Sequence, residues 1–213
     1  MATVAKLFAT KGTRLTEKQL ARYPIIVAGT DLPEKDAVYA FDSRRAFNDW
    51  VRSTKFADKV SHANKLRGKA MKYEKTDNTA ARERQKLSVD RITNELKELS
   101  RRTGLDIASK ELLLKATVER HPLESSIFDP VILFDRPTTT GSFLPLLTCP
   151  MPNLGWFGWN DRASCALAIF GGVVLFQRTW FRGGQAWIFS VPYGVTKLAD
   201  IGFDNIASSA IFL

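Results

Sequence analysis

The sequence predicts a chain of two parts: an α+β module with a helical hairpin over residues 1–125, and an all-β domain over residues 126–213. The charge points to this division, because the formal net charge is +9 and the residues from 126 onward hold five basic and five acidic side chains, so the whole excess lies before them. Apolar residues at helical spacing mark the first part. Short apolar runs between glycines and prolines, arranged in a repeated pattern, mark the second part and predict a β-sandwich.

The first part is expected to begin with strands and continue with helices. Its apolar runs and periodic segments predict strands at Tyr23–Gly29 and Ala37–Phe41 and helices at Arg44–Arg52, Lys55–Glu74, Thr79–Arg102 and Ser109–Glu119. Asp42 and Ser43 offer an N-cap for the first helix, on which Phe47, Trp50 and Val51 would share one face. The third helix is the clearest, and it carries a narrow apolar stripe of Val89, Ile92, Leu96 and Leu99.

The basic charge of this first part has several interpretations. Lys55–Arg102 contains 14 basic and seven acidic residues that alternate in sign, as solvated helix faces do. An acidic membrane surface, a nucleic acid or another acidic partner are alternatives, although no known nucleic-acid-binding signature accompanies the charge. The stripe fits either the core of a helical hairpin or the seam of a homo-oligomer.

The second part contains a duplicated unit. VILFDRPTTTG at Val131–Gly141 aligns with VVLFQRTWFRG at Val173–Gly183, and NDRASC at Asn160–Cys165 aligns with DNIASS at Asp204–Ser209. The two offsets are nearly equal, which indicates one repeated element. Each unit is expected to have an apolar first strand, a tight turn that ends at a glycine, a second strand, a long loop, the polar motif and a closing strand. The glycine suits a fold-over hairpin because it adopts positive φ freely.

These motifs resemble those of the βγ-crystallins, most closely the calcium-binding microbial members. The resemblance is carried by Phe176…Phe181-x-Gly183, its weaker copy Phe134…Thr139-x-Gly141, and the two polar motifs that follow them. It covers Phe128–Leu213 and implies a double Greek-key sandwich. The first part of the chain shows no such resemblance.

The resemblance also implies two calcium sites, each shared between the two units. The family pattern assigns side-chain oxygens to Asp161 and Asn205, hydroxyls to Ser164 and Ser208, and backbone carbonyls to Arg162, Ile206, Asp135 and Gln177. Oxygen ligands of these kinds suit calcium, a hard cation. The site with Asp161 should bind more tightly than the site with Asn205, because it has one more formal charge. Cys165 and Thr139 depart from the family pattern.

The function expected from these features is a non-enzymatic calcium-binding protein, in which calcium stabilises the second part and the first part serves partner binding or oligomerisation. No nucleophile–histidine pair, phosphate loop or zinc-type spacing indicates an enzyme. Alternatives are a proteinase inhibitor of similar fold and a membrane-active, toxin-like protein that acts through the basic helices. No signal peptide or apolar span is visible, which favours the cytoplasm. Cys149 and Cys165 are expected to be buried thiols, although pairing between them stays open.

Overall fold

The computed structural model describes residues 6–8, 20, 22–29, 31–32, 38–74, 79–118, 131–146, 150–168, 171–190 and 193–213. The helices are α2 (Arg44–Arg52), α3 (Ala57–Met71), α4 (Thr79–Thr103) and α5 (Lys110–Val118), with short 3-10 turns η1 (Leu154–Phe157) and η2 (Leu198–Ile201). The strands are β1 (Lys6–Phe8), β2 (Ile25–Ala28), β3 (Val38–Phe41), β4 (Val131–Phe134), β5 (Phe143–Pro145), β6 (Cys165–Ala168), β7 (Gly172–Arg178), β8 (Arg182–Phe189), β9 (Gly194–Lys197) and β10 (Ser209–Phe212).

The C-terminal strands form two Greek-key units that exchange their third strands. The four-stranded sheet has the order β5-β4-β6-β9, so β9 of the second unit pairs with β6 of the first. In return, Met151 of the first unit forms a bridge with Ala210 in β10, beside β7 and β8 of the second unit. Each sheet is therefore completed by a segment of the other unit, and neither unit would be closed alone.

The N-terminal strands extend the second of these sheets. Strand β2 pairs in parallel with β8, and β3 and β1 continue outward, which gives a six-stranded sheet of order β1-β3-β2-β8-β7-β10. Gly29 follows β2 at φ +133°, where a Cβ atom would lie 1.7 Å from the Phe189 carbonyl oxygen. Only glycine permits this close approach of the two backbones. The two parts of the chain thus share one sheet.

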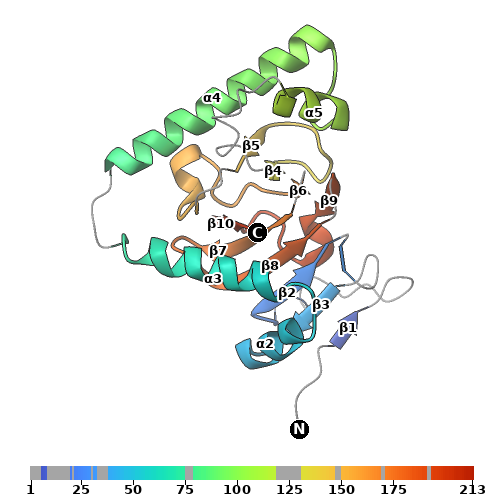
Figure 1. The fold of residues 1–213 in the computed structure, drawn as a ribbon, viewed down its shortest axis with the longest axis vertical. Coiled ribbons are helices and arrows are strands. Elements are labelled where there is room, and N and C mark those ends of the chain that lie inside the picture. The colour runs from blue at the N-terminus through green and yellow to red at the C-terminus, as the bar shows by residue number, and fades with distance from the viewer. Residues whose placement is uncertain are drawn as a thin grey trace.

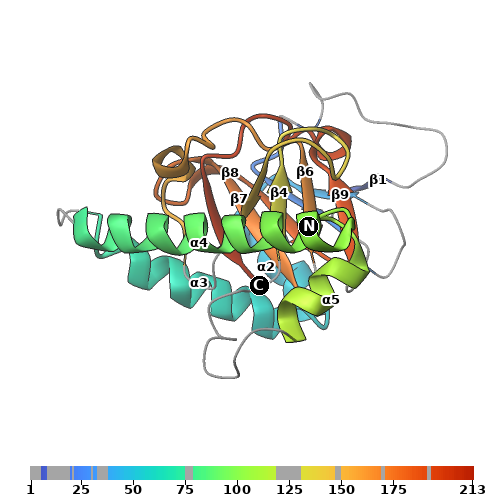
Figure 2. The same cartoon turned by 90° about the horizontal axis from the view of Figure 1, so that it is seen from above.

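Helices cover both outer faces of the sandwich, as Figures 1 and 2 show. Helices α2 and α3 pack on the outer face of the six-stranded sheet, where Phe47, Phe56 and Val60 meet Trp187 and Phe189 in one apolar cluster. Helices α4 and α5 lie on the other side, and α4 packs against β5 and η1. The order of layers is helix, sheet, sheet, helix, which explains why all four residues of β4 are buried.

The predicted helices and strands of the first part are confirmed in position and type. Ser43 caps α2, and its Oγ accepts a hydrogen bond from the Ala46 N–H at 3.2 Å. Phe47 and Val51 of α2 are buried, and Trp50 beside them packs on Tyr39 and Phe56. The α+β module and the sandwich are as expected.

The predicted helical hairpin is not a pair of helices that bury their apolar sides against each other. Although α3 and α4 are consecutive, α3 buries its apolar side against the six-stranded sheet, and α4 buries its stripe on the opposite side of the sandwich. All four stripe residues are 5% exposed or less. The stripe therefore packs against other elements of the same chain, in the core. The predicted boundary between residues 125 and 126 lies outside the described residues. None of the described helices has the length and hydrophobicity of a transmembrane segment.

Candidate cation sites

The two polar motifs form loops that hold each other in place. The Asp161 N–H donates to the Ala207 carbonyl at 3.0 Å, and the Asn205 N–H donates to the Ala163 carbonyl at 2.9 Å. Asp161 and Asn205 both have φ of 53°, a left-handed conformation that aspartate and asparagine tolerate better than most residues. The reciprocal bonds place the second residue of each motif beside the serine of the other.

The first cluster of oxygen atoms joins Asp161, Ser208 and Gln177. Ser208 Oγ lies 3.2 Å from Asp161 Oδ1 and 3.0 Å from the Gln177 carbonyl oxygen. Ser208 is buried and Asp161 is exposed, so the hydroxyl forms the floor of the cluster and the carboxylate its solvent side. The single Ser208 hydroxyl proton has two acceptors, Asp161 Oδ1 and the Gln177 carbonyl, which leaves the cluster rich in acceptors.

The second cluster is the counterpart of the first. Ser164 Oγ lies 3.3 Å from Asn205 Oδ1. The Ser164 N–H donates to the Phe134 carbonyl at 2.8 Å, just as the Ser208 N–H donates to the Phe176 carbonyl at 2.8 Å. Asp135 follows Phe134 as Gln177 follows Phe176, so its carbonyl occupies the equivalent position in the chain. The structure thus brings together predicted residues from both motifs in each cluster.

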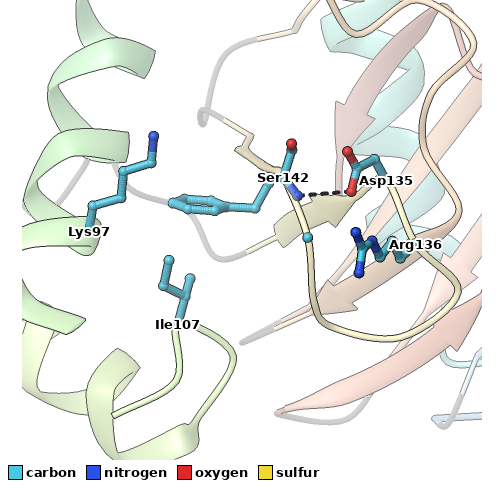
Figure 3. Close-up of a pocket in the computed structure, with 7 residues that line it drawn as sticks. Lys97, Ile107, Asp135, Arg136 and Ser142 are labelled. Carbon is cyan, nitrogen blue, oxygen red and sulfur yellow. Dashed lines mark hydrogen bonds between the residues drawn. The ribbon is translucent and has the colours of Figure 1, made fainter. Parts of the chain in front are cut away.

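The side chains of Asp135 and Gln177 have a separate task in the fold-over hairpins. Asp135 Oδ1 accepts from the Ser142 N–H at 2.9 Å, as Figure 3 shows, and Gln177 Oε1 accepts from the Gly184 N–H at 3.0 Å. Gly141 and Gly183 have φ of 86° and 76°, which confirms the predicted need for glycine in each turn. Because the side chains are used in the turns, the carbonyls of these two residues are left as the predicted cation ligands.

The Arg162 side chain crosses to the first hairpin. Its Nη2 lies 3.1 Å from Asp135 Oδ2, its Nη1 donates to the Gly158 carbonyl at 3.0 Å, and its guanidinium covers the Trp159 ring. Burial alone would raise the pKa of Asp135, but hydrogen bonds from Ser142 and the charge of Arg162 outweigh it and lower the pKa below its ordinary value. A positive charge is therefore held beside the hairpin of the second cluster.

The remaining predicted ligands are the carbonyls of Arg162 and Ile206. Among the described residues, neither carbonyl accepts a hydrogen bond, so both are available to a cation. No group of three or more His, Cys, Asp or Glu side chains gathers anywhere in the described ranges, so a cation here would need carbonyl, amide and hydroxyl oxygens beside any single carboxylate such as that of Asp161. Calcium accepts such ligands at 2.3–2.6 Å, which sets neighbouring oxygens on the order of 3 Å apart, close to the spacing around Ser208. The donor set fits calcium.

The side chain of Asp204, the first residue of the second motif, was not among the predicted ligands. Its Oδ2 accepts a hydrogen bond from Asn205 Nδ2 at 3.1 Å. Its Oδ1, however, is buried without a hydrogen-bond partner. A buried carboxylate oxygen in this state is costly and favours a nearby cation. The sequence signal was the acidic first position of the second motif, where the first motif has Asn160.

The departures from the family pattern have clear structural consequences. Ser209 Oγ accepts from the Phe181 N–H at 3.0 Å and donates to the Arg178 carbonyl at 2.8 Å, which locks the second hairpin. Its counterpart Cys165 is a buried free thiol, as predicted, and burial raises its pKa to about 11. Phe181 is buried edge-on against Phe176, whereas its counterpart Thr139 is only half-buried. Cys149 lies outside the described residues.

A pocket of about 450 Å³ opens beside the first hairpin, between it and α4 (Figure 3). Lys97 and Ile107 line it from the helical side, and Arg136, Ser142 and Phe143 line it from the hairpin. The pocket shares Asp135 with the second cluster. The helical part of the chain therefore borders the first hairpin.

Comparison with known proteins gives structural matches only: no protein-family model matches the chain, and no curated protein matches it. Among solved structures, a βγ-crystallin from Ciona intestinalis is similar at 25% identity and a TM-score of 0.35, over 39% of this chain and 98% of that one. A structure described as "Evolution of the eye lens beta-gamma-crystallin domain fold" is similar at 18% identity and a TM-score of 0.37, over 41% and 87%. A βγ-crystallin from an archaeon is similar at 19% identity and a TM-score of 0.35, over 40% and 98%. Strand order and the exchanged third strands make the C-terminal part a βγ-crystallin-type region.

Proposed function

We propose that the chain is a non-enzymatic calcium-binding protein with two unequal sites in its βγ-crystallin-type region. The observation that carries the proposal is the cluster of Asp161 Oδ1, Ser208 Oγ and the Gln177 carbonyl, three oxygens that share one proton. The unused carbonyls of Arg162 and Ile206 and the buried Asp204 Oδ1 add further acceptors around the two motifs. An excess of acceptors with few formal charges suits a divalent cation of flexible coordination.

The two sites are proposed to differ in affinity. The first has the carboxylate of Asp161, whereas the equivalent group in the second is the Asn205 amide. Beside the second, the carboxylate of Asp135 is paired with Arg162, which cancels its negative charge. Both features favour stronger binding at the first site.

The proposed role of calcium follows from linkage. Each site is built from both units, because Asp161 meets Ser208 and Asn205 meets Ser164. A cation that binds only the folded arrangement stabilises it in proportion to the logarithm of one plus its concentration over Kd. The N-terminal elements cover both outer faces of the sandwich, and we propose that they brace it. Partner binding through their exposed basic faces stays a prediction.

Calorimetric titration with calcium tests the proposal directly. The wild-type chain should show binding in two phases. Asp161→Ala and Ser208→Ala should each remove or weaken the tighter phase, because they remove oxygens of the first cluster. The matched control is Asp90→Ala, which removes an exposed carboxylate from α4 and should leave both phases unchanged. No heat of binding in the wild-type chain would contradict calcium binding and leave the fold unaffected.

A further inference from the structure

Two half-buried arginines lie together between α3 and the outer face of the six-stranded sheet. Arg44 Nη1 donates to Gln185 Oε1 at 2.9 Å, and its Nη2 donates to Asn64 Oδ1 at 2.6 Å. The Arg67 guanidinium lies 5.3 Å from the centre of the Phe176 ring. Gln185 is paired directly opposite Phe176 across β7 and β8, and Asn64 is one helical turn from Arg67. The two guanidinium groups therefore lie over the same cross-strand pair, Phe176 and Gln185.

The partners of these cations are neutral. In the described part of the chain, no carboxylate forms an ion pair with Arg44 or Arg67. Gln185 Oε1 already accepts from Trp187 Nε1 at 3.1 Å, so its single oxygen serves two donors. Arg67 Nε is buried without an acceptor. The nearby Arg182 is different, because Glu74 pairs with it at 2.7 Å.

This arrangement carries an electrostatic cost. Burial lowers the pKa of both arginines, and the charge of Arg67 lowers the pKa of Arg44 further, because neighbouring cations repel each other. The aromatic rings of Phe47, Trp187 and Phe176 offset part of the cost through cation–π contacts. They do not neutralise two charges. Charges withdrawn from water are normally paired, so an anion would compensate this half-buried pair of cations.

We propose that Arg44 and Arg67 form a binding site for a phosphate group, either as free phosphate or as the monoester of a small molecule. A phosphate carries close to two negative charges at neutral pH, which matches two guanidinium groups. Arginine forks bind phosphate oxygens through paired N–H donors. Within the described residues no hydrogen bond from the Arg67 guanidinium is formed, so its terminal N–H groups remain for an anion. The positive net charge of the first part of the chain favours the approach of any anion.

The test measures binding of inorganic phosphate to the full chain by calorimetry, with thermal unfolding followed in phosphate and in chloride at equal ionic strength. Phosphate should bind and raise the unfolding temperature of the wild-type chain. Arg44→Met and Arg67→Met should each weaken binding at least about tenfold, since a charged hydrogen bond is lost. Arg52→Met is the control, because Arg52 is exposed on the same α2 and paired with Asp49.

Two further arms separate the possible outcomes. Arg67→Lys keeps the charge but not the fork, so it should fold normally and bind phosphate more weakly than the wild-type chain. The affinities of phenyl phosphate and inorganic phosphate are then compared. If the natural ligand is a monoester, phenyl phosphate should bind more tightly than inorganic phosphate. If it is the free ion, inorganic phosphate should bind as tightly as phenyl phosphate or more tightly. The proposal is overturned if phosphate does not bind the wild-type chain, or binds Arg67→Met equally well.

Discussion

At the scale of residues, Asp161 and Asn205 hold equivalent positions with different charge. Both have the same left-handed φ, and each faces the serine of the other motif. The backbone is therefore equally prepared at both sites, and the side-chain charge is the main variable. The sites can be made more alike by changing one group.

Asn205→Asp should strengthen calcium binding at the proposed second site on the order of tenfold, because it adds a carboxylate of the same shape. Calcium titration by calorimetry measures the change. The control is Asn94→Asp, which adds the same charge on the exposed face of α4 and should leave both affinities unchanged. An unchanged second phase in Asn205→Asp would mean that residue 205 is not a ligand.

The thiol of Cys165 should be unreactive in the folded chain. It is fully buried, and its raised pKa keeps it protonated at pH 8, where thiol reagents attack the thiolate. In a Cys149→Ser background, labelling should need unfolding, and its rate should fall further in calcium. The thiol pKa of 9.0 in the unfolded chain is raised to about 11 on folding, so stability should decline as pH rises from 9.0 toward 11. Rapid labelling at neutral pH would contradict the burial.

At the scale of elements, α4 is a covering layer of the sandwich. Its stripe is buried against β5, η1 and α5, and its opposite face is charged and exposed. The same helix also carries Leu87, which is 69% exposed. These two kinds of leucine provide an internal comparison.

Leu96→Ala should lower the free energy of unfolding by about 2–5 kcal/mol, because it leaves a cavity in the shared core. Leu87→Ala should change it by less than about 0.5 kcal/mol, because that side chain lies in solvent. Urea unfolding followed by tryptophan fluorescence reports the effect, since four of the five tryptophans lie in the C-terminal part. Equal effects of the two substitutions would show that α4 does not pack as described.

The sequence predicts much of this element scale because its signals are local. Helical spacing, the Ser43 cap and the glycine turns depend on residues close in sequence, and the duplicated motifs identify the sandwich. The pairing of β2 with β8 has no such signal. Parallel strands are not joined by a short turn with a recognisable sequence, and these two lie far apart in the chain. The stripe of α4 predicts that one face of the helix is buried. It does not identify the surface that buries it, because any apolar surface would do so. Strand β9 was expected to be part of a loop, because its pattern is short.

At the scale of the whole molecule, the two parts of the chain share a sheet and a hydrophobic core. Strand β2 continues the sheet of the second unit, and α4 completes the core on the other side. The change in charge near residue 125 is therefore a change in composition only, because the six-stranded sheet contains strands from both sides of it. The two parts of the chain should unfold together.

Thermal unfolding should show one transition, with the helical signal in the far ultraviolet and tryptophan fluorescence changing together. Calcium should raise both midpoints by the same amount, because the sites lie in the sandwich that the helices cover. Magnesium at equal concentration is the control, since it demands a more rigid octahedral site. A helical transition that comes first and ignores calcium would separate the two parts.

The central claim is that each calcium site is made from both motifs, and double variants test it most directly. Asp161 and Ser208 belong to one of the proposed sites, so calorimetry on Asp161→Ala with Ser208→Ala should show one weakened site and little further loss over either single variant. Asp161→Ala with Ser164→Ala should weaken both sites, because Ser164 belongs to the site of Asn205. The reverse result, in which Asp161 and Ser164 act on one site, would contradict the account.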